Sequence, residues 1–372
     1  MECWKSPVFD RKKDTNSYTI EDLRGLKIAP PNEEIRKRIR GRWDNVAKPI
    51  DGMGRFEPLT AQIGAICGTE EIDISRKAVI IMCADNGIVE EGISQSGQEV
   101  TLAVAKNMGR GKSSVGRMAK SLGACTIPVD IGINCTETIP GVLDRKIRCG
   151  TRNFMKEPAM TREEAVRSIF TGIEMVARCR DEGYQILATG EMGIGNTTTS
   201  AAVAAALFGC EAAEVTGRGA GLSDGKLVHK REIIGKAIAL YGLKEADALR
   251  ILMTVGGFDI GGLAGVCIGG GIFHMPIVLD GVISMVAALL AERILPGIRE
   301  YLIPSHKGKE PAVERLAKEL GLTPVIDGCM ALGEGTGAVM MFALLDMALS
   351  VYREGSSFGD IGMERYQRGE YA

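Results

Sequence analysis

Residues 185–209, QILATGEMGIGNTTTSAAVAAALFG, contain the pattern that decides the fold. A short apolar run is followed by a turn rich in glycine, and the turn is followed by an alanine-rich run. A strand, a glycine turn and a helix in this order are typical of α/β proteins. The turn also carries Glu191, which places a carboxylate beside a predicted helix N-terminus.

The composition indicates a globular protein with one large domain and a smaller one. The chain has 372 residues, of which 45% are hydrophobic, and a formal net charge of −2. This charge gives no reason to expect nucleic acid or an anionic membrane as a partner. Ten cysteines are dispersed without a CxxC motif, which fits free thiols in a reducing cytoplasm. The three histidines form no HExxH motif, so we expect no metal centre.

Two segments bear on export and membranes. The first 14 residues, MECWKSPVFDRKKD, are too polar for a signal peptide. Residues 260–279 carry no formal charge, as in a membrane span, but they include His274 and Pro276 and have no flanking Lys or Arg. We therefore interpret residues 260–279 as a buried helix followed by a buried parallel strand.

Short runs rich in Val and Ile alternate with helical stretches along the chain. Apolar strands without a polar face, separated by helices, predict a parallel sheet covered on both faces. The predicted strands are 77–84, 125–131, 185–189, 214–216, 276–280, 301–305 and 324–327. The predicted helices are 100–122, 161–182, 198–209, 225–240, 282–293 and 310–320. Ligands are expected at the carboxyl ends of the strands.

The two ends of the chain differ from this central part. The N-terminal end is charged and mostly helical in pattern, and an apolar helix, AVMMFALLDMALSVY, begins near residue 338. We predict a Rossmann-like, three-layer α/β catalytic domain over residues 75–337. A small helical domain is predicted from residues 1–74 plus 338–372.

The glycine turn after residue 189 is the first candidate for a binding site. Free backbone amides at a helix N-terminus favour an anion. Gly193, Gly195, Asn196 and Thr197 are therefore predicted to bind a phosphate or a carboxylate. The alternative is that Asn196 and Thr197 only cap the helix.

A second strand, turn and helix, PVIDGCMALGEGTGAVMMFALL (324–345), favours the ligand-binding interpretation. Glu334 lies between Gly333 and Gly335, and such small neighbours leave room for a ligand. A nearby helix start is expected to favour the charged form of Glu334, whereas an aromatic ligand and apolar neighbours such as Leu332 would favour its neutral form. These opposing effects are typical of a general base that works near neutral pH.

A third acidic turn, CADNGIVEEGISQSGQEVT (83–101), follows a predicted strand. Its candidate ligand-binding residues are Asp85, Glu90, Ser94 and Gln98. The alternative is a solvated loop with turn-forming residues.

Two weaker signals follow along the chain, TGRGAGLSDGKLVHK (216–230), which ends in Lys230, and VGGFDIGGLAG (255–265). The alternative for either of them is a helix cap or a turn. Asp280 lies at the end of a predicted strand. Sheets of this class place ligand-binding groups at strand ends, which is why Asp280 is a candidate.

Seven motifs, in this order, resemble the nicotinate-nucleotide–dimethylbenzimidazole phosphoribosyltransferases, which assemble the lower ligand of cobalamin. They are DNVAKPIDGMGRFE, ADNGIVEEGISQSGQEVT, GEMGIGNTTTSAAV, GGFDIGGLAG, VLDGVIS, SHKGKEP and LGEGTGA, over about residues 44–350. The resemblance implies transfer of a phosphoribosyl group from nicotinate mononucleotide to dimethylbenzimidazole. It also implies inversion at the anomeric carbon, no metal or cofactor, and a homodimer.

The resemblance also implies roles for particular residues. Glu334 matches the family's general base, and Glu191 lies in the same site. Lys230 and Asp280 match further active-site positions. The amides of residues 193–198 meet the nucleotide, and the turn at 85–98 supplies the pocket for the base.

Two positions depart from the family pattern. Ala331 stands where many relatives carry a basic residue, and Gly308 stands where many carry serine. Both are expected near the anionic groups of the nucleotide, where Lys307 or Lys309 could substitute.

Two other functions remain open at this point. One is a Rossmann oxidoreductase that binds pyrophosphate at residues 193–198, with Glu211 or Glu214 ending the next strand as the ribose-binding acid. The other is a non-catalytic protein that binds a base or a nucleotide.

Overall fold

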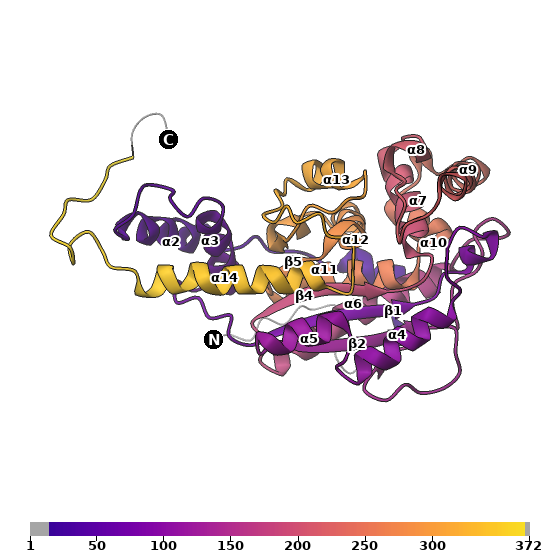
Figure 1. The fold of residues 1–372 in the computed structure, drawn as a ribbon, viewed down its shortest axis with the longest axis horizontal. Helices are drawn as coiled ribbons and strands as arrows, with labels where there is room; N and C mark the ends of the chain where they lie inside the picture. The colour runs from indigo at the N-terminus through magenta and orange to yellow at the C-terminus, as the bar shows by residue number, and fades with distance from the viewer. Residues whose placement is uncertain (1–14, 369–372) are drawn as a thin grey trace.

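The computed structural model, which describes residues 15–368, has one sheet of six parallel strands with helices on both faces (Figure 1). The strands are β1 (Lys77–Ala84), β2 (Cys125–Gly132), β3 (Leu143–Asp144), β4 (Ile186–Met192), β5 (Ile277–Leu279) and β6 (Leu302–Pro304). The helices before β4 are α1 (Ile20–Gly25), α2 (Glu33–Asn45), α3 (Phe56–Cys67), α4 (Glu99–Gly109), α5 (Ser114–Ser121) and α6 (Arg162–Asp181). Those after β4 are α7 (Asn196–Phe208), α8 (Ala212–Val215), α9 (Asp224–Tyr241), α10 (Ala248–Val255), α11 (Phe258–Phe273), α12 (Gly281–Ile294), α13 (Val313–Leu320) and α14 (Thr336–Glu354). The predicted Rossmann-like α/β fold is confirmed.

The order of the strands, β3-β2-β1-β4-β5-β6, decides where a ligand can bind. β1 pairs with β2 on one side and with β4 on the other, so the order reverses between β1 and β4. In open α/β sheets, ligands bind beyond the carboxyl ends of the strands at such a reversal. Asp85 directly follows β1 and Glu191 lies near the end of β4, so both candidate residues lie at this point.

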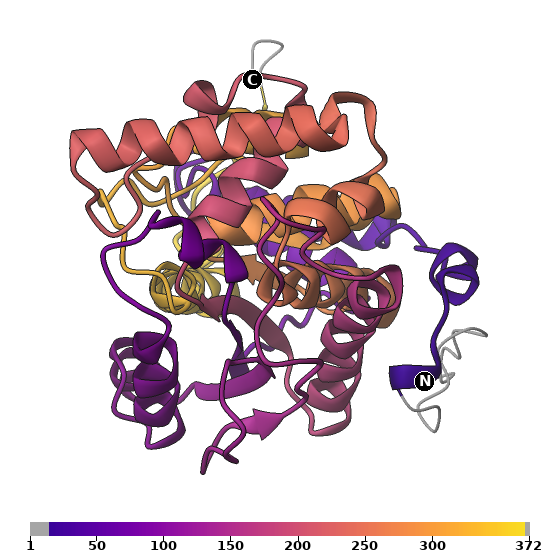
Figure 2. The ribbon, with the colours of Figure 1, turned by 90° about the vertical axis from the view of Figure 1, so that its right-hand side faces the viewer.

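The side chains of β1 show why its sequence has no polar alternation. All eight positions are buried, and successive side chains point to opposite faces of the sheet. Ile80 and Met82 belong to the core formed with α6, α11 and α12. Val79 and Ile81 belong to the core formed with α4, α5 and α14. Figure 2 shows these helical layers on opposite sides of the sheet.

The uncharged segment 260–279 is a buried helix followed by a buried strand, as predicted. Every residue of α11 is buried, and β5 follows it. Glycines let α11 lie directly against α6, because a Cβ at Gly265 would be only 1.9 Å from the carbonyl oxygen of Ile169. The described helix with the length and composition of a membrane span is α14, yet 56% of that stretch is buried inside the protein, as in a core helix.

Two predicted strands are wrong. Residues 214–216 include the end of α8, because the Glu214 carboxylate accepts a hydrogen bond from the backbone N–H of Glu211 at 2.9 Å and closes a helical turn. Residues 324–327 form no strand and make only one bridge, between His306 and Ile326. Neither Glu211, which precedes α8, nor Glu214 ends a strand. Neither can therefore serve as the acid of a dinucleotide site, which contradicts the oxidoreductase alternative.

The predicted helix 100–122 is in fact two helices, α4 and α5. Gly111 has φ +65°, which ends helical geometry. Ser113 then caps α5, because its hydroxyl accepts a hydrogen bond from the N–H of Gly116 at 3.2 Å. The other predicted helices and strands are confirmed, with ends that differ by up to three residues.

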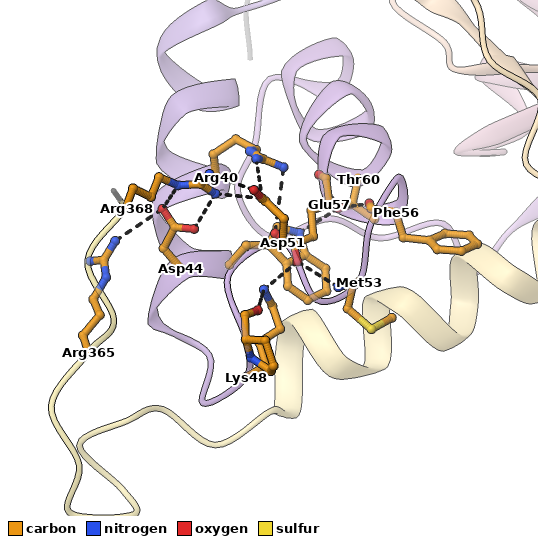
Figure 3. A network of polar contacts seen from close by, with 12 residues as sticks. Arg40, Asp44, Lys48, Asp51, Met53, Phe56, Glu57, Thr60, Arg365 and Arg368 are labelled. Atoms are coloured by element: carbon orange, nitrogen blue, oxygen red, sulfur yellow. Dashed lines mark hydrogen bonds and ion pairs between the residues drawn. The ribbon is translucent and has the colours of Figure 1, made fainter. Parts of the chain in front are cut away.

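The terminal segments meet beside α14. This helix extends beyond the sheet and packs against α3 (Figure 1). The chain after α14 returns along α2, where Arg368 pairs with Asp44 and Asp51, each at 2.8 Å (Figure 3). The domain division at residues 74 and 338 stays a prediction. Residues 1–14, to which the expectation of no signal peptide applies, and residues 369–372 lie outside the described part of the chain.

Candidate active site

A cavity of about 260 Å³ lies where the turns after β4, β5 and β6 meet the turn before α14. Eight predicted site residues line it: Glu191, Gly193, Asn196, Thr197, Asp280, Leu332, Gly333 and Glu334. Ser94 and Gly195 line a smaller adjoining cavity. A larger cavity, of about 550 Å³, lies among α1, α10 and α12 and is lined by none of the predicted residues. We therefore place the candidate site in the 260 Å³ cavity, at the strand ends.

Glu191 is a buried carboxyl group in this cavity with a strongly raised pKa. Its side chain is buried and accepts a hydrogen bond from the Asn196 amide. Burial raises the pKa of Glu191 to about 8, the nearby carboxyl groups of Asp259 and Asp280 add to the rise, and the Asn196 amide opposes it. Glu191 is therefore mostly protonated at neutral pH.

The turn that carries Glu334 is strained and lies against β4. Glu334 has φ +63°, and Gly333 and Gly335 on either side also have positive φ. A Cβ at Gly333 would lie 2.7 Å from the Glu191 carboxyl oxygen Oε1, so glycine lets the turn approach β4 closely. The Glu334 oxygen Oε2 accepts a hydrogen bond from the N–H of Val115 at 3.1 Å. The first turn of α5 thus orients this carboxylate.

Asp280 holds the start of α14 in place. Its buried carboxylate accepts hydrogen bonds from the N–H groups of Gly335, Gly337 and Ala338 at 2.9, 2.8 and 3.2 Å. Burial raises the pKa of Asp280 to about 7, although these three donors oppose the rise. Because Gly335 is adjacent to Glu334, Asp280 also fixes the position of the candidate base.

Lys230 reaches the edge of the cavity from α9. The side chain is fully buried, and Nζ donates to the Thr197 hydroxyl at 2.9 Å. Burial lowers the pKa of Lys230 to about 8, and the charge of Glu310 opposes this effect. A buried cation beside Thr197, which lines the cavity, suits an anionic part of a ligand.

The turn at residues 193–198 does not cap α7 with side chains. The N-cap residue is Gly195, with φ +93° and no side-chain cap. The Asn196 side chain bonds to Glu191 and that of Thr197 accepts from Lys230, so the helix-cap alternative is wrong. The N–H groups of Asn196 and Thr198 donate within the turn itself.

The acidic turn after β1 contributes mainly supporting contacts. Asp85 is buried and accepts from the N–H of Asn134 at 2.8 Å, and Gln98 bonds to the side chain of Asn134, also at 2.8 Å. Glu90 is exposed and pairs with Lys156 at 2.7 Å. The structure therefore does not bring Glu90 to the cavity.

Two buried residues at or near the cavity are not among the site residues that the sequence predicts. Asp259 is buried at the start of α11, and burial raises its pKa to about 7. His306 lines the cavity with 7% of its surface exposed. The motifs GGFDIGG and SHKGKEP contain them, but a lone Asp or His gives no signal of burial. Within residues 15–368, no group of three His, Cys, Asp or Glu side chains could hold a metal ion.

The two departures from the family pattern both lie at the cavity. Ala331 and Gly308 line it, and so does Lys309. Lys307 instead pairs with Glu314 at 2.6 Å. Of the two lysines considered as substitutes, Lys309 is the one placed to meet a ligand.

Comparisons with known proteins agree on one family. A sequence family described as phosphoribosyltransferase matches residues 28–363. The nicotinate-nucleotide–dimethylbenzimidazole phosphoribosyltransferase of Ruminiclostridium cellulolyticum is 42% identical over 90% of this chain and 96% of its own. The enzyme of the same name from Acetivibrio thermocellus is 43% identical over 90% of this chain and 95% of its own. The crystal structure of CobT from Thermus thermophilus has a TM-score of 0.85 and 36% identity, covering 90% of this chain and all of that one.

Proposed function

Since the chain belongs to the nicotinate-nucleotide–dimethylbenzimidazole phosphoribosyltransferase family and is a phosphoribosyltransferase, we propose that its substrates are nicotinate mononucleotide and dimethylbenzimidazole or a related base. The products are then α-ribazole phosphate and nicotinate. The observation that carries this proposal is a cavity at the strand reversal that is lined by both Glu191 and Glu334 and bordered by Lys230.

Glu334 acts as the general base in this proposal. A nitrogen of the neutral base attacks the anomeric carbon from the side opposite nicotinate, so the configuration inverts. The bond to nicotinate breaks, and its electron pair neutralises the positive pyridine nitrogen. The attacking ring would keep a positive charge, but Glu334 takes its N–H proton as the new bond forms. Such help is worth roughly 10²- to 10⁴-fold in rate.

Glu191 responds to the charge of the nucleotide. Nicotinate mononucleotide carries a positive pyridine nitrogen bonded to the ribose. A cation beside Glu191 favours its ionised form, because opposite charges lower the pKa of a carboxyl group. Glu191 is then a carboxylate when the positive ring is bound and stabilises positive charge that develops at the ribosyl carbon.

Lys230 and Thr197 bind the phosphate beside the turn at 193–198, in which the N–H groups of Asn196 and Thr198 are already used within the turn. Within residues 15–368, the buried ammonium of Lys230 donates to two neutral acceptors, the Thr197 hydroxyl at 2.9 Å and the Gly217 carbonyl at 3.5 Å. A phosphate dianion in contact with this ammonium would add a countercharge to that of Glu310, at the N-terminus of α7, where anions are favoured.

The test replaces the candidate base. Glu334→Gln keeps the size of the side chain and the hydrogen bond from Val115, and we expect turnover to fall by roughly 10²- to 10⁴-fold with little change in stability. Glu319→Gln, which removes a surface carboxylate paired with Arg293, is the matched control. Chromatography of reactions with nicotinate mononucleotide and a panel of bases measures the products. Near-normal turnover by Glu334→Gln would refute its role.

A cytoplasmic location and a homodimer are also part of the proposal. The nine cysteines among residues 15–368 are all free, as expected in a reducing compartment. Light scattering during size-exclusion chromatography measures the oligomeric state, and a monomeric mass would remove the homodimer.

A further inference from the structure

The ring of His306 is held in one orientation beside the cavity. A Cβ at Gly337 would lie 2.0 Å from Nδ1, so the ring packs directly against the backbone of α14. Nε2 is on the side of Gly281, where a Cβ would lie 3.3 Å away. Gly281 and His306 both line the cavity. The two glycines therefore make the space in which this ring sits.

The hydrogen bonds of Ser305 determine which nitrogen of His306 carries the proton. The Ser305 hydroxyl donates to the carbonyl oxygen of Leu279 at 2.5 Å. A serine has one hydroxyl proton, so its contact with His306 Nδ1 at 3.0 Å must be one in which Nδ1–H donates and the hydroxyl oxygen accepts. The Asp280 carboxyl oxygen, 3.8 Å from Nδ1, also favours a proton there.

Nε2 is consequently a hydrogen-bond acceptor. Burial lowers the pKa of His306, so the ring is neutral at neutral pH and Nε2 keeps its lone pair. No group within residues 15–368 donates a hydrogen bond to Nε2. An acceptor at the wall of a binding cavity is complementary to a donor on the ligand.

The donors on the proposed substrates are few. In nicotinate mononucleotide the carboxylate and the phosphate are ionised at neutral pH, which leaves the two ribose hydroxyls. The N–H of the benzimidazole is the proton that Glu334 removes. We propose that Nε2 of His306 accepts a hydrogen bond from a ribose hydroxyl of the nucleotide and so selects ribonucleotides. This inference rests on the proposed function.

Substrates and variants together test the contact. For the wild-type protein we expect kcat/KM to be about 10- to 100-fold lower with one of two analogues, the 2′-deoxy or the 3′-deoxy nucleotide, than with nicotinate mononucleotide. The affected analogue is the one that lacks the hydroxyl bound by Nε2, so that Nε2 is left without a donor. His306→Asn places an amide near Nδ1 but none near Nε2, so its preference for the ribonucleotide should fall to nearly none. His306→Gln extends an amide oxygen toward Nε2 and should keep part of the preference.

The outcomes separate this inference from the proposed function. A wild-type protein that uses all three nucleotides equally, or an Asn variant that discriminates like the wild type, overturns the role of His306 alone. If the wild-type protein releases no nicotinate with any base, the proposed function itself fails.

A spectroscopic measurement is independent of whether the variants fold. The chain has three histidines, so ¹⁵N spectra of the labelled protein can resolve each ring. We expect His306 to be protonated on Nδ1 and its Nε2 signal to move when nicotinate mononucleotide is added. A proton found on Nε2, or no movement of that signal on addition, would overturn the assignment.

Discussion

Glu191→Gln should change how the stability of the protein depends on pH. The pKa of this carboxyl group is raised from 4.5 to about 8, mainly by burial. Between these two values the folded protein holds a proton that the unfolded chain has lost. Stability therefore falls as pH rises through this range, because the folded state binds more protons. Below about pH 4.5 both states are protonated and Glu191 contributes no such loss.

The size of the effect follows from the same two values. At 1.36 kcal/mol for each pKa unit, the full rise corresponds to about 5 kcal/mol. Asp259 and Asp280 raise the pKa of Glu191 and themselves titrate near 7, so part of the loss is shared among the three groups. We expect Glu191→Gln to gain on the order of 3–5 kcal/mol relative to the wild type between about pH 5 and pH 9.

Urea unfolding at a series of fixed pH values measures this difference. The Gln side chain keeps an oxygen that can accept from Asn196, so the comparison isolates the ionisation of Glu191. Glu314→Gln is the control, because Lys307 lowers the pKa of this exposed carboxyl group, which is the opposite direction from the shift of Glu191. A stability difference between Glu191→Gln and the wild type that is constant from about pH 5 to pH 9 would show that burial does not raise this pKa.

Three further predictions concern the surroundings of the cavity. Asp280→Ala leaves three N–H groups at the start of α14 without their acceptor. Urea unfolding should show that the free energy of unfolding falls by about 2–4 kcal/mol. An unchanged midpoint of unfolding would contradict the capping role. Lys230→Met should raise the KM for nicotinate mononucleotide at least about 10-fold. The wild-type KM should rise above about pH 8, because the ammonium loses its proton there. Steady-state kinetics that show the same KM in the variant, and no change of the wild-type KM with pH, would exclude a phosphate contact. Gly193→Ala places a Cβ 2.2 Å from the carbonyl oxygen of Ala84 and should lower the melting temperature strongly. Gly225→Ala is the control and should leave the melting temperature unchanged, because the space around Gly225 is open. Equal melting temperatures for the two variants would refute the close approach of Gly193 to Ala84.

Much of the chemistry is already visible in the sequence. Glycine on both sides of Glu334 predicts a turn that approaches another part of the protein or a ligand closely, and the structure places that turn against β4. The motif containing Glu191 predicts a carboxylate at a strand end next to a helix, where the structure has it. These features depend on residues a few positions apart, where backbone preferences and strand or helix periodicity act directly.

Other features depend on residues far apart in the sequence. The sequence predicts Asp280 as a ligand-binding residue, and the structure also makes it the acceptor for N–H groups more than 50 residues later. The motif around Glu90 predicts a ligand contact, yet its side chain pairs with Lys156 at the surface. Val and Thr at the end of α8 favour a strand in the sequence, but the contact between Glu211 and Glu214 closes a helical turn.

The sequence by itself determined the class of fold, the order of most strands and helices and, through the order of its motifs, the family. Only the tertiary structure decided the order of strands in the sheet, the shape of the cavity, the pKa of Glu191 and the orientation of His306. The physical reason is that local preferences act over a few residues. Desolvation, hydrogen bonding and charge interactions depend instead on which distant residues packing brings together.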